Sequence, residues 1–132
     1  MTAMRRHWAP VLAVVVALAI PVAAGADQPH VLTVLAVKVK GDQDAYLEKV
    51  KKFIASAKRL DAGGTTRVWR ASLAGTDSGL IFIASEFPNL EAFAKGNAKV
   101  QADEELKKLR KEINASGVRE VVSSSLFEEV TP

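Results

Sequence analysis

The chain has 132 residues, with 18 Lys and Arg against 15 Asp and Glu, and a formal net charge of +3. This length suits a single domain with one hydrophobic core. The sequence contains no cysteine, which excludes disulfides and lipid attachment through an N-terminal cysteine.

Residues 1–26 have the composition of a secretory signal peptide. Arg5 and Arg6 precede the apolar run at residues 11–20, and small residues follow up to Ala26. A helix needs about 20 apolar residues to span a bilayer, and this run is shorter. We therefore expect cleavage after Ala26, which leaves a periplasmic or secreted protein free of the membrane. An uncleaved anchor is the alternative, and ordinary export fits the flanking residues better than twin-arginine export. Loss of the two arginines leaves 16 basic against 15 acidic residues, so we expect no nucleic-acid partner.

The mature chain, residues 27–132, is predicted to be one domain that begins with a strand and a helix. Residues 31–39 (VLTVLAVKV) are mostly β-branched or apolar and predict a strand. A turn with an N-cap follows at residues 41–44, and the apolar positions of residues 46–60 recur at helical spacing. The glycine pair at residues 63–64 is expected to end this helix.

Two further strands are predicted at residues 66–74 and 80–87. The link between them, GTDSG at residues 75–79, is short, polar and bounded by glycines. We therefore expect an antiparallel hairpin.

The remaining residues predict a helix in two pieces and a last strand. Asn89 is placed to cap the first piece. Gly96 and Asn97 weaken that helix, Asp103 restarts it, and Gly117 ends it before a strand at residues 118–130.

The order βαββαβ predicts an α+β, ferredoxin-like fold, in which a four-stranded antiparallel sheet carries its helices on one face. A sheet with one wet face should alternate apolar and polar residues. The runs VLTVLAV and LIFIA do not alternate, so both sheet faces are apolar. We therefore expect a homodimer that packs the second faces of two sheets together into an α/β barrel.

Three segments resemble the dimeric α/β-barrel superfamily, and within it the antibiotic-biosynthesis monooxygenases and NIPSNAP-type domains: RVWRASLAG, GTDSG and SEFPNLEAF (residues 85–93). The likeness covers essentially the whole mature chain and concerns the fold rather than a catalytic motif. It implies a pocket between sheet and helices or inside the barrel. Haem-degrading members have a strand tryptophan, a histidine on the second helix and an asparagine on the first strand. Trp69 could supply the first, but residues 90–114 hold no histidine and Thr33 replaces the asparagine, which argues against haem degradation.

The stretch RVWR at residues 67–70 supplies the candidate ligand-binding residues. Arg67 and Trp69 share one face of the strand and Arg70 lies on the other. Arg70, taken as central and buried, needs a carboxylate, for which Glu86 on the neighbouring strand is the first candidate. A structural Arg70–Glu86 pair or dimer contact is favoured over an arginine that holds a ligand. The resemblance to the oxygenases adds Tyr46 to the candidate ligand-binding residues, and Glu86 completes the set of five as the expected neighbour of Arg70.

Other reactive side chains have simpler explanations. His30 has no nearby Cys or carboxylate pair, so we expect no metal site. Ser123–Ser125 lack an activating histidine. The acids at residues 103–105 suit a helix start, and KKLRK at residues 107–111 reads as a solvated helix face.

The sequence therefore predicts no cofactor and identifies no catalytic residue. The first hypothesis is an exported dimer that binds a small, partly apolar ligand in a pocket on the sheet. The alternative is a cofactor-independent monooxygenase or isomerase that acts on an aromatic or lactone-like molecule. A structural dimer without a ligand is the third.

Overall fold

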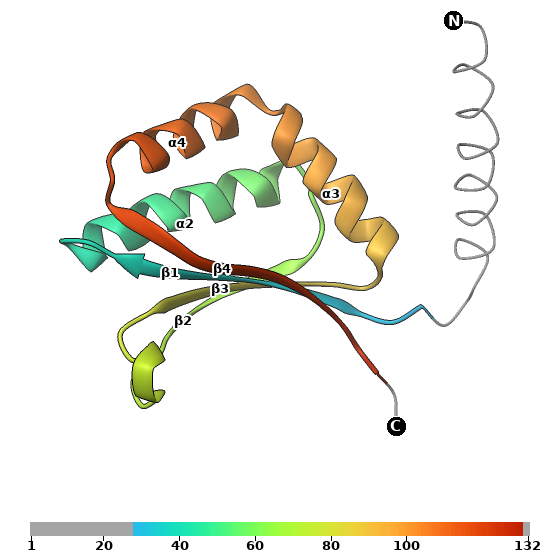
Figure 1. Cartoon of the computed structure of the whole chain (residues 1–132). Coiled ribbons are helices and arrows are strands. Elements are labelled where there is room, and N and C mark those ends of the chain that lie inside the picture. The colour runs from blue at the N-terminus through green and yellow to red at the C-terminus, as the bar shows by residue number, and fades with distance from the viewer. Residues whose placement is uncertain (1–27, 131–132) are drawn as a thin grey trace, which may run out of the picture.

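The computed structural model describes residues 28–130 (Figure 1). Its elements in chain order are β1 (Val31–Val39), α2 (Gln43–Arg59), β2 (Thr65–Arg70), the 3-10 helix η2 (Gly75–Asp77), β3 (Ile81–Phe87), α3 (Leu90–Ala102), α4 (Glu104–Ala115) and β4 (Arg119–Glu128). The predicted signal peptide and its cleavage site lie outside the described residues. None of the helices within residues 28–130 has the length and apolar composition of a membrane span.

The four strands form one antiparallel sheet in the order β2-β3-β1-β4. All three α-helices cover the same face of this sheet, and no described element covers the other face (Figure 1). This arrangement confirms the predicted ferredoxin-like α+β fold. A register shift at Ala36/Val37 of β1 places Val122 as an extra residue in β4.

The helices begin where the sequence predicted, because an acidic or amide side chain caps each one. Asp42 Oδ1 accepts from the Asp44 backbone N at 2.9 Å, and Asn89 Oδ1 accepts from the Ala92 N at 2.8 Å. Asp103 Oδ2 accepts from the Leu106 N at 2.9 Å and separates α3 from α4. The second helix is therefore in two pieces as predicted.

Gly96 does not interrupt α3, which runs through it without a break. A Cβ at this position would lie 1.7 Å from the backbone oxygen of Ala62 and 3.4 Å from the Phe87 ring. Glycine is needed here because the loop after α2 passes directly against α3.

The core lies between the sheet and the helices. It is built from Val37, Tyr46, Val50, Ile81 and Ile113, all buried. Val37 and Ile81 are 0% and 1% exposed and lie opposite each other in the sheet, so the covered face is the one that holds odd-numbered β1 and β3 residues.

The uncovered face, which we call the open face, carries large apolar side chains in water. Trp69 is 58% exposed, Phe127 53% and Leu32 37%. Phe82 lies opposite Trp69, and Phe127 lies opposite Leu32. The prediction that both faces of the sheet are apolar is thus confirmed.

The hairpin turns earlier than predicted. β2 ends at Arg70 rather than at residue 74, and a loop that contains η2 leads to β3. Gly79 N donates to the Ala71 oxygen at 2.6 Å and Ala71 N donates to the Leu80 oxygen at 2.9 Å, which closes the hairpin at the base of this loop.

Candidate functional site

A cavity of about 300 Å³ lies between the covered face of the sheet and the three helices. Aromatic and aliphatic side chains make most of its wall, including Phe53, Ile83, Phe87, Phe93 and Val100. Phe87 and Phe93 meet edge to face with 5.4 Å between ring centroids, which is a favourable aromatic geometry. The wall is thus set by contacts between a strand and a helix.

A row of hydroxyl groups crosses the floor of the cavity. Thr66, Ser85 and Thr33 lie on β2, β3 and β1, and Ser85 is opposite each of the other two. The oxygens of Thr66 and Ser85 are 2.7 Å apart, and Thr33 Oγ1 donates to the Ser85 carbonyl at 3.4 Å. These groups give the apolar cavity a polar strip, and the single bond between Thr66 and Ser85 leaves one of their two hydroxyl hydrogens without an acceptor in that pair.

Arg119 brings a positive charge to the cavity from the first residue of β4. It lies opposite Val39 on the covered face. Its Nη1 donates to the Tyr46 hydroxyl at 3.0 Å and its Nη2 donates to Asn114 Oδ1 at 3.3 Å. Its Nε is buried and has no hydrogen-bond partner among the described residues, a state that costs about 1–3 kcal/mol.

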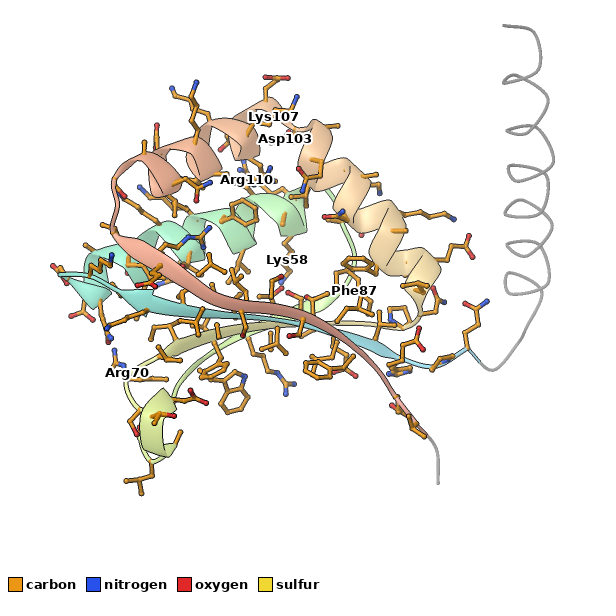
Figure 2. All side chains as sticks on the ribbon, in the orientation of Figure 1. Lys58, Arg70, Phe87, Asp103, Lys107 and Arg110 are labelled. Carbon is orange, nitrogen blue, oxygen red and sulfur yellow. The ribbon has the colours of Figure 1, made fainter. Side chains whose placement is uncertain are left out.

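Arg110 is the second cation of the cavity wall. Its Nη1 donates to Gln101 Oε1 at 2.9 Å, and its guanidinium carbon lies 5.9 Å from the centre of the Phe53 ring. Figure 2 shows Arg110 on the side of α4 that faces α2. The prediction that residues 107–111 form only a solvated face is therefore wrong at Arg110, which is half-buried.

The described wall of this cavity contains no Asp, Glu, His, Lys or Cys side chain. General acid–base chemistry draws mainly on these residues. Among residues 28–130 there is also no group of three or more possible metal ligands. The arrangement is suited to holding a molecule by shape, a few hydrogen bonds and positive charge.

The five predicted site residues do not form one site: none of them lines the cavity, and Trp69 and Arg70 line a separate groove. Arg67 and Trp69 lie on the open face, opposite Ala84 and Phe82. Tyr46 is buried in the core, where it contacts Arg119 rather than the cavity.

The predicted Arg70–Glu86 pair is wrong. Arg70 is the last residue of β2 and lies opposite Ile81, whereas Glu86 lies opposite Thr65 at the other end of the strand. Glu86 Oε1 instead lies 3.2 Å from His30 Nδ1 in an exposed pair. Arg70 is exposed and not central, because β2 ends earlier than the sequence indicated.

Arg70 and Trp69 do line a second hollow, a groove of about 350 Å³ between α2 and the β2 edge of the sheet. Leu47, Lys51 and Val68 contribute to the same groove. Figure 2 shows Arg70 beside the β2–β3 loop, far along the sheet from Phe87. The groove and the cavity nevertheless adjoin, because Val50 and Ile54 of α2 line both.

Sequence reasoning missed Arg119 and the hydroxyl row. Arg119 comes two residues after the helix-ending Gly117, and alternation along β4 could not assign its face, because the extra residue at Val122 reverses the alternation. The hydroxyl row spans three strands, and only their register brings its members together.

No family model and no curated protein matches the sequence. Several solved structures do share its fold. A NIPSNAP family protein of unknown function from Agrobacterium tumefaciens is 17% identical, with a TM-score of 0.61, over 80% of this chain and 91% of that one. SnoaB, a cofactor-independent oxygenase from Streptomyces nogalater, is 13% identical, with a TM-score of 0.59, over 79% and 96%.

A conserved protein from Bacteroides thetaiotaomicron, described as a possible oxidoreductase, is 14% identical, with a TM-score of 0.57, over 77% of this chain and 99% of that one. At such identities the likeness establishes the fold alone. It confirms the resemblance, at the level of fold, to the monooxygenase-like and NIPSNAP-type proteins.

Proposed function

We propose that this ferredoxin-like domain binds a small, largely apolar molecule in the cavity between its sheet and its helices. The observation that carries the proposal is the cavity itself: about 300 Å³ of space with aromatic walls and a few polar groups. Protein interiors pack at crystal-like density and have few voids larger than a water molecule, so a space of this volume is not expected in a core that only packs.

The size and lining of the cavity are those of a small-molecule site. Ligand pockets have volumes of about 300–1,000 Å³ and combine apolar walls with a small number of polar groups. A cavity of about 150 Å³ is enough for benzene, so this one suits a molecule of one or two rings or a short chain.

An enzymatic function is the alternative, as a cofactor-independent monooxygenase or isomerase. It is favoured by one finding, the shared fold with the cofactor-independent oxygenase SnoaB. It is disfavoured by the lack of the usual acid–base side chains in the described cavity wall. We therefore place binding first.

The test is native mass spectrometry of protein purified from its own host. We expect a stoichiometric mass adduct that is lost on denaturation. Ala57→Phe, at a cavity-lining position, should abolish the adduct by filling the space. Ala94→Phe, on the exposed side of α3, is the matched control and should retain it. No adduct in the wild type, or an adduct that survives Ala57→Phe, would refute the proposal.

The enzymatic alternative needs a separate readout. If the recovered adduct is converted on incubation in air, with oxygen consumed or an isomer formed, the oxygenase or isomerase function holds. An adduct recovered unchanged supports binding alone.

We also propose that two copies associate through their open faces. Trp69, Phe82, Phe127 and Leu32 form an apolar centre on that face. Exposed polar pairs lie at its margin, His30 with Glu86 and Lys40 with Glu120. An apolar, aromatic centre with a polar rim is the usual composition of a protein interface, and sedimentation velocity should find the dimer at micromolar concentration.

Export is proposed from the sequence of residues 1–26. Intact-mass measurement on protein recovered outside the cytoplasm should give a chain that begins at Asp27. A full-length mass would favour the uncleaved anchor instead.

A further inference from the structure

The cavity wall carries positive charge that nothing in the described structure neutralises. Arg110 and Arg119 both line it, and neither forms an ion pair within residues 28–130. Their hydrogen-bond acceptors are the neutral groups of Gln101, Tyr46 and Asn114. A guanidinium taken partly out of water without a counter-charge is unfavourable.

Arg119 also has hydrogen-bonding capacity to spare. A guanidinium has five N–H donors, and the described contacts of Arg119 use one on Nη1 and one on Nη2. The Nε–H also has no partner, but its nitrogen is buried, so the donors left for a ligand are the remaining N–H groups of Nη1 and Nη2. Arginine presents these donors as a planar fork that matches the two oxygens of a carboxylate.

We infer that the ligand of the cavity is an apolar carboxylate, whose carboxylate group binds Arg119 and whose body lies along the apolar wall of the cavity. This inference rests on the proposed ligand-binding function and specifies its ligand class. The carboxylate supplies the counter-charge that Arg119 lacks and accepts from N–H groups of its Nη atoms. Arg119 lies opposite Val39 and Phe87 opposite Val31, at the two ends of β1, so only a long body reaches Phe87.

Tyr46 acts in this arrangement as a positioning residue. Its hydroxyl accepts from Arg119 Nη1 at 3.0 Å, and its ring is held in the core at 1% exposure. It fixes the guanidinium without touching the ligand. The sequence predicts that Tyr46 contacts the ligand. In the structure Tyr46 instead holds Arg119, the residue that binds the ligand in this inference.

The experiment is calorimetric titration of the purified chain, expressed from its full coding sequence, with three acids and their neutral amides. The pairs are benzoate and benzamide, 2-naphthoate and 2-naphthamide, and decanoate and decanamide. In each pair the body is the same and only the charge differs. We expect at least one acid to bind about 10-fold or more tightly than its amide, as befits a charge-assisted hydrogen bond.

Variants then locate the preference. Arg119→Gln should reduce the acid-over-amide ratio to near 1, and Arg119→Lys should keep only part of it because lysine has no fork. Tyr46→Phe should lower the ratio less than Arg119→Gln does. Arg59→Gln, an exposed arginine paired with Glu105 outside the cavity, is the matched control and should leave the ratio unchanged.

Each outcome decides a different claim. If acids and amides bind equally, or if Arg119→Gln and Arg59→Gln have the same ratio, the carboxylate inference is overturned and the apolar binding function stands. If none of the six compounds binds, the carboxylate inference is overturned, and the native mass spectrum decides the binding function separately. If circular dichroism shows that Arg119→Gln does not fold, the acid-over-amide affinity ratio of the wild type decides the inference alone.

Discussion

The two faces of the sheet are made of the same four strands and the same kinds of residue, yet they have opposite environments. On the covered face Val37 and Ile81 are 0% and 1% exposed; on the open face Trp69 and Phe127 are each more than half exposed. Adjacent residues such as Ile81 and Phe82 therefore belong to different structural regions.

This contrast shows that apolar character alone does not reveal what covers a face. The helices α2, α3 and α4 bury one face within the chain. The other face has equally large side chains and no described element over it. Single substitutions on the two faces should therefore differ in kind: those on the covered face should change the stability of one chain, and those on the open face the association of two.

Ile81→Ala should have the largest effect. It removes a fully buried side chain from the core beside Val37 and Tyr46, and such truncations cost about 2–5 kcal/mol because they leave a cavity. Urea unfolding followed by circular dichroism measures the loss. Leu73→Ala, in the exposed β2–β3 loop, is the control and should change nothing. A loss below about 1 kcal/mol at Ile81 would contradict the assignment of the core.

Gly96→Ala should cost about 2 kcal/mol, although alanine is the better helix former. The new Cβ would collide with the Ala62 oxygen, so α3 would have to move away from the loop that follows α2. Gly75→Ala meets nothing within 4 Å and is strained only by its φ of 61°; it should cost about 1 kcal/mol. If Gly96→Ala is as stable as the wild type in urea, α3 does not pack against Ala62 as closely as the structure shows.

Trp69→Ala should weaken the dimer about 30-fold or more, the size of effect seen when a central interface aromatic is removed. The unfolding of the separated chain should change little, since the side chain is largely exposed. Sedimentation velocity over a concentration series measures the first effect. Val68→Ala, on the same strand but the opposite face, should leave association intact. Equal effects of the two variants would count against an interface on the open face.

Glu86→Gln should have the smallest effect. The His30–Glu86 pair is 3.2 Å long with both side chains more than half exposed, and pairs of this kind contribute about 0–1 kcal/mol. Chemical unfolding at neutral pH should show a change near zero, as for Glu120→Gln in the similar pair with Lys40. A loss well above 1 kcal/mol would mean that Glu86 has a further partner.

The sequence predicted the element order because local chemistry determines it. Asp42, Asn89 and Asp103 cap helices, and Gly117 has the positive φ expected after one. The ferredoxin-like topology followed from that order. These features depend on residues within a few positions of one another.

The candidate site could not be predicted in the same way. Whether Arg70 is central depends on where the hairpin turns, and β2 ends at Arg70 because the loop with η2 begins there. The role of Arg119 depends on Tyr46, 73 positions earlier in the chain. Both are consequences of register and packing, which local patterns do not encode.

The central position of β1 has a consequence for how the chain comes to be folded. β1 is the first strand of the described chain, and it pairs only with β3 and β4, which come later. A newly made chain can pair one edge of β1 once β3 is available, but the other edge stays unpaired until the last segment is made, because these contacts are non-local. The sheet is incomplete until β4 has been made. During this time the unfolded chain could pass through a narrow translocation channel, or its unpaired strands could aggregate with those of other chains.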